Sequence, residues 1–140
     1  MHKKIKYLIG GPKIYNNSDI PFSKDIINFL SNFSMQLNKE NEYYKFSDIS
    51  SLVFWCREKN LIRLKKKYKQ KNKIGLGTIF HITPSNVPTN FCYSLIFGLL
   101  TGNTNIVKVP SQRFDQIKII CDALKKTMKI SSKFNNRIIL

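Results

Sequence analysis

The chain has few acidic residues and few arginines, and each scarcity bears on what it can bind. Only 8 Asp and Glu stand against 24 Lys and Arg, so 140 residues carry a formal net charge of +16. This charge would favour nucleic acid or an anionic surface as partner. Arginine, which binds phosphate and guanine through a bidentate fork, nevertheless occurs only 4 times. Lys, Ile and Asn, which an AT-rich genome over-supplies, make up 53 of the residues, so we attribute most of the charge to composition and expect no nucleic acid partner.

Cysteines and long apolar runs are also scarce. Cys56, Cys92 and Cys121 form no CxxC pair and have no metal-ligand spacing, so we expect buried thiols of a reducing compartment and no metal site. The longest apolar run, 91–100, is about half the length of a membrane span, and the N-terminus lacks the apolar core of a signal peptide. These absences predict a cytoplasmic protein without a membrane span.

The length allows one domain with a hydrophobic core but not a cofactor domain together with a substrate domain. Residues 3–9 alternate as a short strand would. A helix then begins after Ser23 as N-cap, and apolar residues recur at helical spacing from Ile26 to Leu37. A second helix, capped by Ser47 and Asp48, carries apolar residues as far as Leu64.

The second helix leads into the basic run, residues 57–73, where nine cations accompany the single Glu58. One interpretation is a phosphate-binding face, which salt dependence would test. The other is a solvated helix C-terminus followed by a lysine-rich linker. Tyr68 is the one aromatic residue within the run, fewer than single-strand binders use.

The second half alternates strands and helices. We predict a buried strand over 74–82, a buried helix over 90–100 with Pro88 at its first turn and Gly102 at its end, and a strand over 105–109. A helix striped by Phe114 to Met128 and a third strand from Arg137 follow. The fold class is therefore α/β, an N-terminal helical segment and then a partial Rossmann-like parallel βαβαβ unit. We divide the chain into an oligomerisation-type helical segment with a basic linker, 1–73, and a partial cofactor-binding domain, 74–140.

Candidate site residues lie where two neighbouring strands end, the edge at which open α/β sheets bind ligands. Asn86 either caps the next helix or projects its amide from a rigid loop. Lys108 either holds an anionic or hydroxyl-rich ligand or extends from an edge strand into water. The spacing also favours an N-cap role for Ser111 and a structural role for His81.

Two segments together resemble the aldehyde dehydrogenase superfamily. They are Gly77-Thr-Ile-Phe-His-Ile-Thr-Pro-Ser-Asn-Val-Pro88 and Gly98-Leu-Leu-Thr-Gly-Asn-Thr-Asn-Ile-Val-Lys108. Within it, the sequence is most similar to the fatty acyl-CoA reductases of the bacterial bioluminescence type, over about residues 40–130. The stretch 48–64 is also similar to the region that precedes the motif in those reductases.

The resemblance implies roles for particular residues. Asn86 matches the asparagine whose amide stabilises the oxyanion of the thioester or hemithioacetal intermediate. Lys108 matches the lysine that bonds the adenosine ribose of the nicotinamide cofactor, and Thr83, Pro84 and Ser85 fall in the cofactor-binding turn. Ser111 stands where NAD-preferring members often carry glutamate, which implies NADPH.

The reaction implied is reduction of a fatty acyl-CoA, or of an acyl group donated by a protein, to a fatty aldehyde through an acyl-cysteine. The family's nucleophilic cysteine lies far beyond the 54 positions that follow Asn86, and none of the three cysteines replaces it. We therefore expect the N-terminal part of such a reductase, inactive alone or dependent on a second chain. The alternatives are a basic binding module for nucleic acid or an anionic surface, and an inactive gene remnant.

Overall fold

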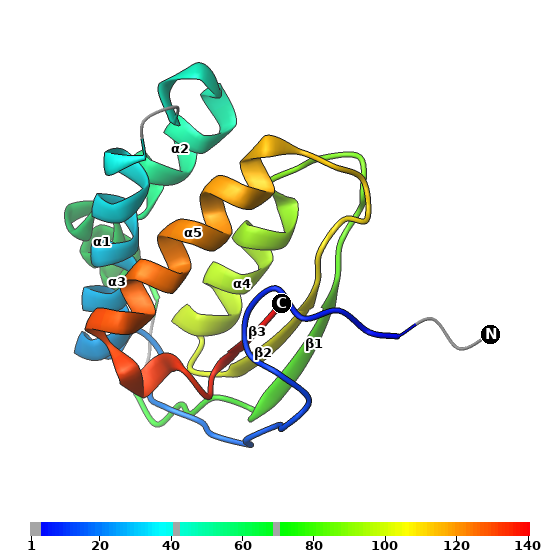
Figure 1. Cartoon of the computed structure of the whole chain (residues 1–140). Coiled ribbons are helices and arrows are strands. Elements are labelled where there is room, and N and C mark those ends of the chain that lie inside the picture. Colours follow the sequence, from blue (N-terminus) through cyan, green and yellow to red (C-terminus); the bar gives the residue numbers. More distant parts are fainter. Residues whose placement is uncertain (1–3, 41–42, 69–70) are drawn as a thin grey trace.

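Strands and helices alternate through the second half of the chain in the computed structural model, which describes residues 4–40, 43–68 and 71–140 (Figure 1). The elements are α1 (Lys24–Lys39), α2 (Ser47–Trp55), α3 (Glu58–Lys67), β1 (Thr78–Ile82), α4 (Asn90–Leu100), β2 (Thr104–Lys108), α5 (Asp115–Ile130) and β3 (Ile138–Ile139). Short 3-10 helices occupy Tyr43–Lys45 and Ser132–Phe134. The predicted α/β class, with N-terminal helices followed by a parallel βαβαβ unit, is confirmed.

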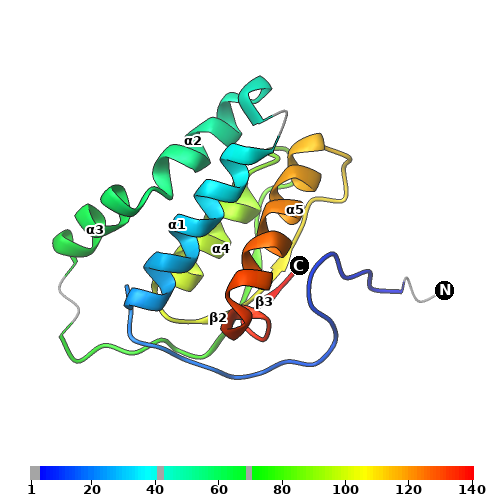
Figure 2. The ribbon, with the colours of Figure 1, turned by 60° about the vertical axis from the view of Figure 1, so that its left-hand side comes forward.

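Helix α1 follows the predicted pattern. Ser23 is its N-cap and accepts a hydrogen bond from the Ile26 N–H at 3.3 Å, while Asp25 lies in the first turn, where a carboxylate complements the helix dipole. The apolar positions Ile26, Leu30, Phe33 and Leu37 are fully buried. Their spacing places them on one face, which packs against α5 and α4 (Figure 2).

The second predicted helix is wrong as a continuous element. It breaks at Cys56 and Arg57, where the backbone of Arg57 becomes extended, and α3 starts at the next residue. The Asn60 side-chain amide donates to the Phe54 carbonyl at 2.6 Å and thus satisfies an acceptor at the end of α2. The break turns α3 so that Leu61 is fully buried.

The strand predicted over residues 3–9 is also wrong where the structure describes it, from Lys4 onward; Lys3 lies outside the described residues. The Leu8 N–H donates to the Leu140 carbonyl at 2.8 Å, and the Leu140 N–H donates to the Ile9 carbonyl at 3.0 Å. These bonds join the segment to one residue beyond β3, too short a pairing to form a ladder.

The sheet is parallel, with strand order β1-β2-β3. The register pairs Ile82 with Lys108 and Ile106 with Ile139. Right-handed crossovers between strands in this order place both connecting helices on one face, and Figure 1 shows α4 and α5 on the same side of the sheet.

Strand β1 is not buried as its sequence predicted. Phe80 is 61% exposed and Ile82 is 70% exposed, because β1 lies at the edge of the sheet and both side chains point away from α4. A continuous apolar run indicates a strand covered on both faces. In the parts of the chain that the structure describes, helices cover only one face of β1, so we refer to the other as the open face.

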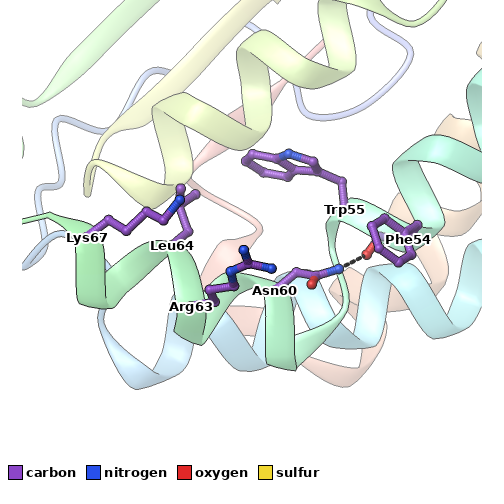
Figure 3. Close-up of a pocket in the computed structure, with 6 residues that line it drawn as sticks. All are labelled: Phe54, Trp55, Asn60, Arg63, Leu64 and Lys67. Carbon is purple, nitrogen blue, oxygen red and sulfur yellow. Dashed lines mark hydrogen bonds between the residues drawn. The ribbon is translucent and has the colours of Figure 1, made fainter.

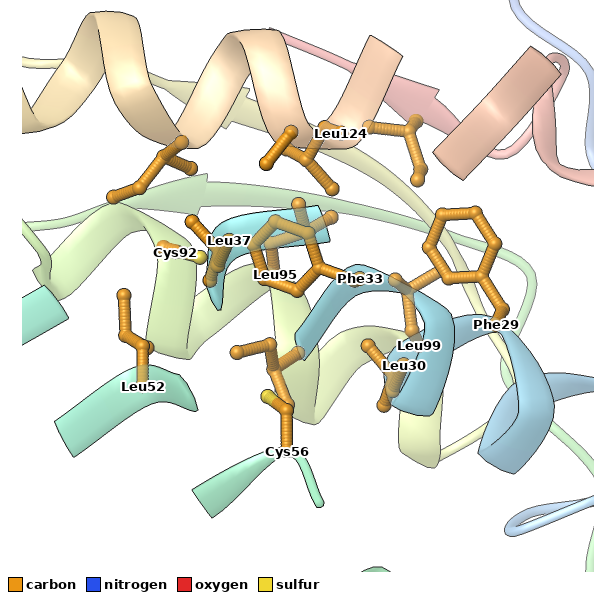
Figure 4. Close-up of a cluster of buried hydrophobic side chains, with 14 of the residues drawn as sticks. Phe29, Leu30, Phe33, Leu37, Leu52, Cys56, Cys92, Leu95, Leu99 and Leu124 are labelled. Atoms are coloured by element: carbon orange, nitrogen blue, oxygen red, sulfur yellow. The ribbon is translucent and has the colours of Figure 1, made fainter. Parts of the chain in front are cut away.

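The hydrophobic core lies between the sheet-covering helices and the N-terminal helices. Core side chains of α1 pack against those of α4, and residues of α2 and α5 complete the cluster (Figure 4). The residues from the first two helices are Phe29, Leu30 and Phe33 of α1 and Leu95 and Leu99 of α4. The core therefore fixes α4, whose N-terminal end carries the loop that contains Asn86.

His81 joins β1, β2 and α4. Its Nδ1 lies 2.8 Å from the Ser94 hydroxyl and its Nε2 lies 2.9 Å from Asn105 Oδ1. Because the Asn105 amide nitrogen donates to the Asn103 carbonyl, Oδ1 is the acceptor, so Nε2 carries the proton and Nδ1 accepts from Ser94. This network agrees with the structural role predicted for His81. Gly98 allows the close approach, since a Cβ there would clash with the Asn105 side chain.

Arg137 connects the segment before α1 to the sheet through hydrogen bonds. It is 3% exposed, and its guanidinium donates to the Gly102 carbonyl at 2.8 Å and to the Asp19 carboxylate at 3.3 Å. Burial acts to raise the pKa of Asp19, but the hydrogen bond from the Ile20 N–H and the charges of Lys133 and Arg137 outweigh it, and the pKa is lowered.

Candidate functional site

A cleft of about 900 Å³ lies where the strands end, between residues of the sheet and the first turns of α5. The end of β2, the loop that follows it, the first turns of α5 and residues 5–8 form its walls. Among the described residues, the charged side chains that line it are Lys6, Lys108, Arg113, Lys118, Asp122 and Lys125. These five cations and one carboxylate favour an anionic ligand here.

Lys108 and Ser111, two of the sequence-predicted site residues, both line this cleft. Lys108 is the last residue of β2 and is exposed. Ser111 lies in the loop and is also exposed. The prediction that Ser111 caps the last helix is wrong: α5 begins at Asp115 with Phe114 as N-cap, and Phe114 also lines the cleft. The Ser111 side chain is thus exposed on the cleft and is not part of a helix cap.

The other predicted residues, Thr83, Pro84, Ser85 and Asn86, form the loop after β1 and do not line the cleft. Because Ile82 pairs with Lys108, this loop leaves the sheet beside the cleft. The N-cap of α4 is Thr89, so the capping interpretation of Asn86 is wrong, and its side chain is exposed on the loop. Pro88 precedes that cap instead of lying in the first turn. The Thr83 hydroxyl is buried and has no hydrogen-bond partner in the described residues.

The three cysteines are free, buried thiols, as predicted. Burial raises the pKa of Cys56 to about 12 and that of Cys121 to about 11. Burial also raises the pKa of Cys92 well above its ordinary value. A thiol must ionise to act as a nucleophile, so none of the three is placed for catalysis.

Sequence reasoning missed a second, smaller pocket of about 210 Å³ beside α3 (Figure 3). Its lining residues are Phe54, Trp55, Asn60, Arg63, Leu64 and Lys67. The spacing of Asn60, Arg63, Leu64 and Lys67 on one helical face was the available signal. The proximity of Trp55 depends on the break between α2 and α3, which periodicity did not reveal.

Across residues 4–40, 43–68 and 71–140, no group of three or more His, Cys, Asp or Glu is placed to hold a metal ion. Among the helices of these same residues, none combines the length and apolar character that crossing a membrane requires.

The fold and the cleft define an α/β protein with an open parallel sheet, the class that binds ligands at the carboxyl ends of its strands. The family model for acyl-CoA reductase (LuxC) matches residues 21–130, and the chain belongs to this family. This confirms the resemblance to fatty acyl-CoA reductases and extends it over α1. Among curated proteins and among solved structures, no match was found.

Proposed function

We propose that these residues form the N-terminal, cofactor-binding part of a reductase that converts fatty acyl-CoA thioesters to fatty aldehydes with NADPH. The proposal rests on one observation. In a chain of the acyl-CoA reductase (LuxC) family, Lys108 and Ser111 lie together on a cationic cleft at the carboxyl edge of a parallel sheet.

The residues of the cleft suit NADPH. Its volume of about 900 Å³ lies within the range of sites for small-molecule ligands and cofactors. Lys108 would bond the adenosine ribose, and Arg113 would pair with the 2′-phosphate. Ser111 is uncharged, so it would not repel that phosphate. When bound, NADPH would supply the hydride that reduces the acyl group.

Asn86 would stabilise the oxyanion that forms when a thiolate attacks the thioester. Its amide can donate a hydrogen bond from an exposed loop that Pro84 and Pro88 stiffen. A donor of this kind contributes about a hundredfold or more to the rate.

The nucleophilic cysteine of this mechanism is not Cys56, Cys92 or Cys121, whose raised pKa values keep them protonated. The proposal therefore assigns the acyl-cysteine to a polypeptide segment other than these residues, supplied by the same protein or by a second chain. These 140 residues alone would bind cofactor and form no aldehyde.

Titration of the chain with NADPH, followed by the fluorescence of the reduced nicotinamide, tests the proposal. Lys108→Ala should weaken binding about tenfold, the value of one charge-assisted hydrogen bond. Lys129→Ala removes the same charge from α5 at an exposed residue outside the cleft and should leave affinity unchanged. A folded chain that binds no NADPH, or equal losses in both variants, would contradict the cofactor assignment.

A further inference from the structure

The small pocket beside α3 has an aromatic wall that other aromatic residues hold in place. Trp55 makes edge contacts with Phe97, at a ring-centroid distance of 5.2 Å, and with Tyr93 at 6.4 Å. Both partners belong to α4, so the indole is held against a helix of the core. The hydrogen bond from Asn60 to Phe54 sets the position of α3 opposite the indole (Figure 3).

Two cations form the rim of this pocket. Arg63 and Lys67 are one helical turn apart on α3, and both are exposed. Of the described residues that line the pocket, none carries a carboxylate. An anionic group placed between Arg63 and Lys67 would thus meet two positive charges, while any group beneath it would contact Trp55 and Leu64.

An aromatic platform next to cations is the combination that binds a nucleotide, since the base stacks and the phosphate pairs with the cations. A cavity of about 210 Å³ is smaller than a typical ligand site, so it admits a single base and leaves the phosphate at the rim. The available volume excludes a dinucleotide, which the larger cleft can hold.

We propose that this pocket binds the phosphorylated adenosine end of the acyl-CoA substrate, an inference that rests on the proposed function. Coenzyme A ends in an adenosine that carries phosphate groups, with a long flexible arm between the nucleotide and the sulfur. The adenine would lie against Trp55, and Arg63 and Lys67 would pair with phosphate oxygens.

The position of the pocket along α4 is compatible with this substrate. Phe97 lies seven residues after Asn90, the first residue of α4, which at 1.5 Å per residue is about 10 Å along the helix. The loop that contains Asn86 leads directly into that end of α4. The arm of coenzyme A is longer than this offset along α4, which is compatible with one molecule that occupies the pocket and extends toward the Asn86 loop.

Trp55 is the sole tryptophan of the chain, so its fluorescence reports on this pocket. Adenosine 3′,5′-bisphosphate should quench it in a saturable way, with an affinity that calorimetry measures independently. Arg63→Ala and Lys67→Ala should each weaken binding about tenfold. Lys66→Ala removes an equal charge from the same helix outside the pocket and should bind like the parent chain. All three positions are exposed, and circular dichroism verifies that helix content is unchanged.

The controls separate this inference from the proposed function. Lys108→Ala should weaken NADPH binding and leave the binding of the bisphosphate unchanged. The inference is overturned if the bisphosphate gives neither heat nor quenching, even when NADPH still binds. It is equally overturned if Lys66→Ala weakens binding as much as Lys67→Ala, or if a single-stranded oligonucleotide of equal nucleotide concentration binds more tightly than the bisphosphate, which would indicate a nucleic acid surface.

Discussion

The ion pair between Arg137 and Asp19 offers the sharpest test of what holds the fold together. Asp19→Asn keeps the size of the side chain and an acceptor for the Ile20 N–H, but it removes the negative charge that faces Arg137 at 3.3 Å. The buried guanidinium would then retain the Gly102 carbonyl and lose its counter-ion. Lys133, which also contacts Asp19, would keep its shorter pair with Asp25 at 2.6 Å.

The exposed fractions of Arg137 and Asp19 determine how much stability Asp19→Asn should remove. Breaking a buried pair by removing one partner costs about 3–5 kcal/mol. Arg137 is 3% exposed but Asp19 is 21% exposed, so water reaches one end of the pair and we expect a loss of about 3 kcal/mol. With a urea slope of about 2 kcal/mol per molar, the unfolding midpoint should fall by about 1.5 M.

Asp25→Asn is the matched control. Asp25 pairs with the same Lys133 but is 57% exposed, and an exposed pair contributes about 0–1 kcal/mol. Its carboxylate also complements the α1 dipole, a contribution of about 0.3–1 kcal/mol, so the midpoint should fall by at most about 1 M. Equal shifts in the two variants would refute the claim that Arg137 depends on the charge of Asp19.

The same pair predicts a pH dependence. The pKa of Asp19 is lowered in the folded chain, so the stabilisation is fully present above the pKa of the unfolded state and is lost as pH falls through the folded value. The difference between the parent chain and Asp19→Asn should be constant near neutral pH and should shrink in acid below about pH 4. Urea titrations at several pH values measure it.

Further predictions concern packing, thiols and cofactor choice. Gly98→Ala should destabilise the chain by about 1–3 kcal/mol in urea unfolding, because the new Cβ would meet Asn105; no loss would show that α4 can shift freely. The three thiols, Cys92 above all, should react with a thiol reagent at pH 8 only after unfolding, and rapid labelling of the folded chain would contradict their burial. Ser111→Glu should weaken binding of NADPH about tenfold and leave binding of NADH nearly unchanged, measured by nucleotide fluorescence; an equal loss for both would place the 2′-phosphate elsewhere.

Local sequence patterns were enough to predict the helices whose end signals and apolar positions lie within or next to their own residues. Ser23 and the spacing from Ile26 to Leu37 predicted α1 correctly, and the apolar run before Gly102 predicted α4 with its end. The order of these patterns along the chain was enough to predict a parallel sheet.

What the sequence could not show depends on contacts between distant residues. An apolar run does not reveal which of its faces is covered, so it predicts buried side chains at Phe80 and Ile82, which the structure exposes. The break at Arg57 follows from a side-chain hydrogen bond and from the burial of Leu61, neither of which changes the helical period.

The candidate site also has a part that the sequence predicts and a part that depends on contacts between distant residues. The ends of β1 and β2 were predictable as one edge, because the strands are parallel, and Lys108 and Ser111 do lie on one cleft there. The pocket at Trp55 was not predictable, since it needs α3 to turn away at Arg57 while Trp55 approaches α4. Nothing in the periodicity of either helix specifies that approach.

The open face of the sheet sets how the molecules behave toward one another in solution. Phe80 and Ile82 offer an apolar surface that attracts a second molecule, whereas a net charge of +16 repels it. Salt screens the repulsion and leaves the apolar attraction in place. Self-association should therefore increase with ionic strength, so purification and storage call for dilute buffer, and light scattering across a salt series would follow the balance directly.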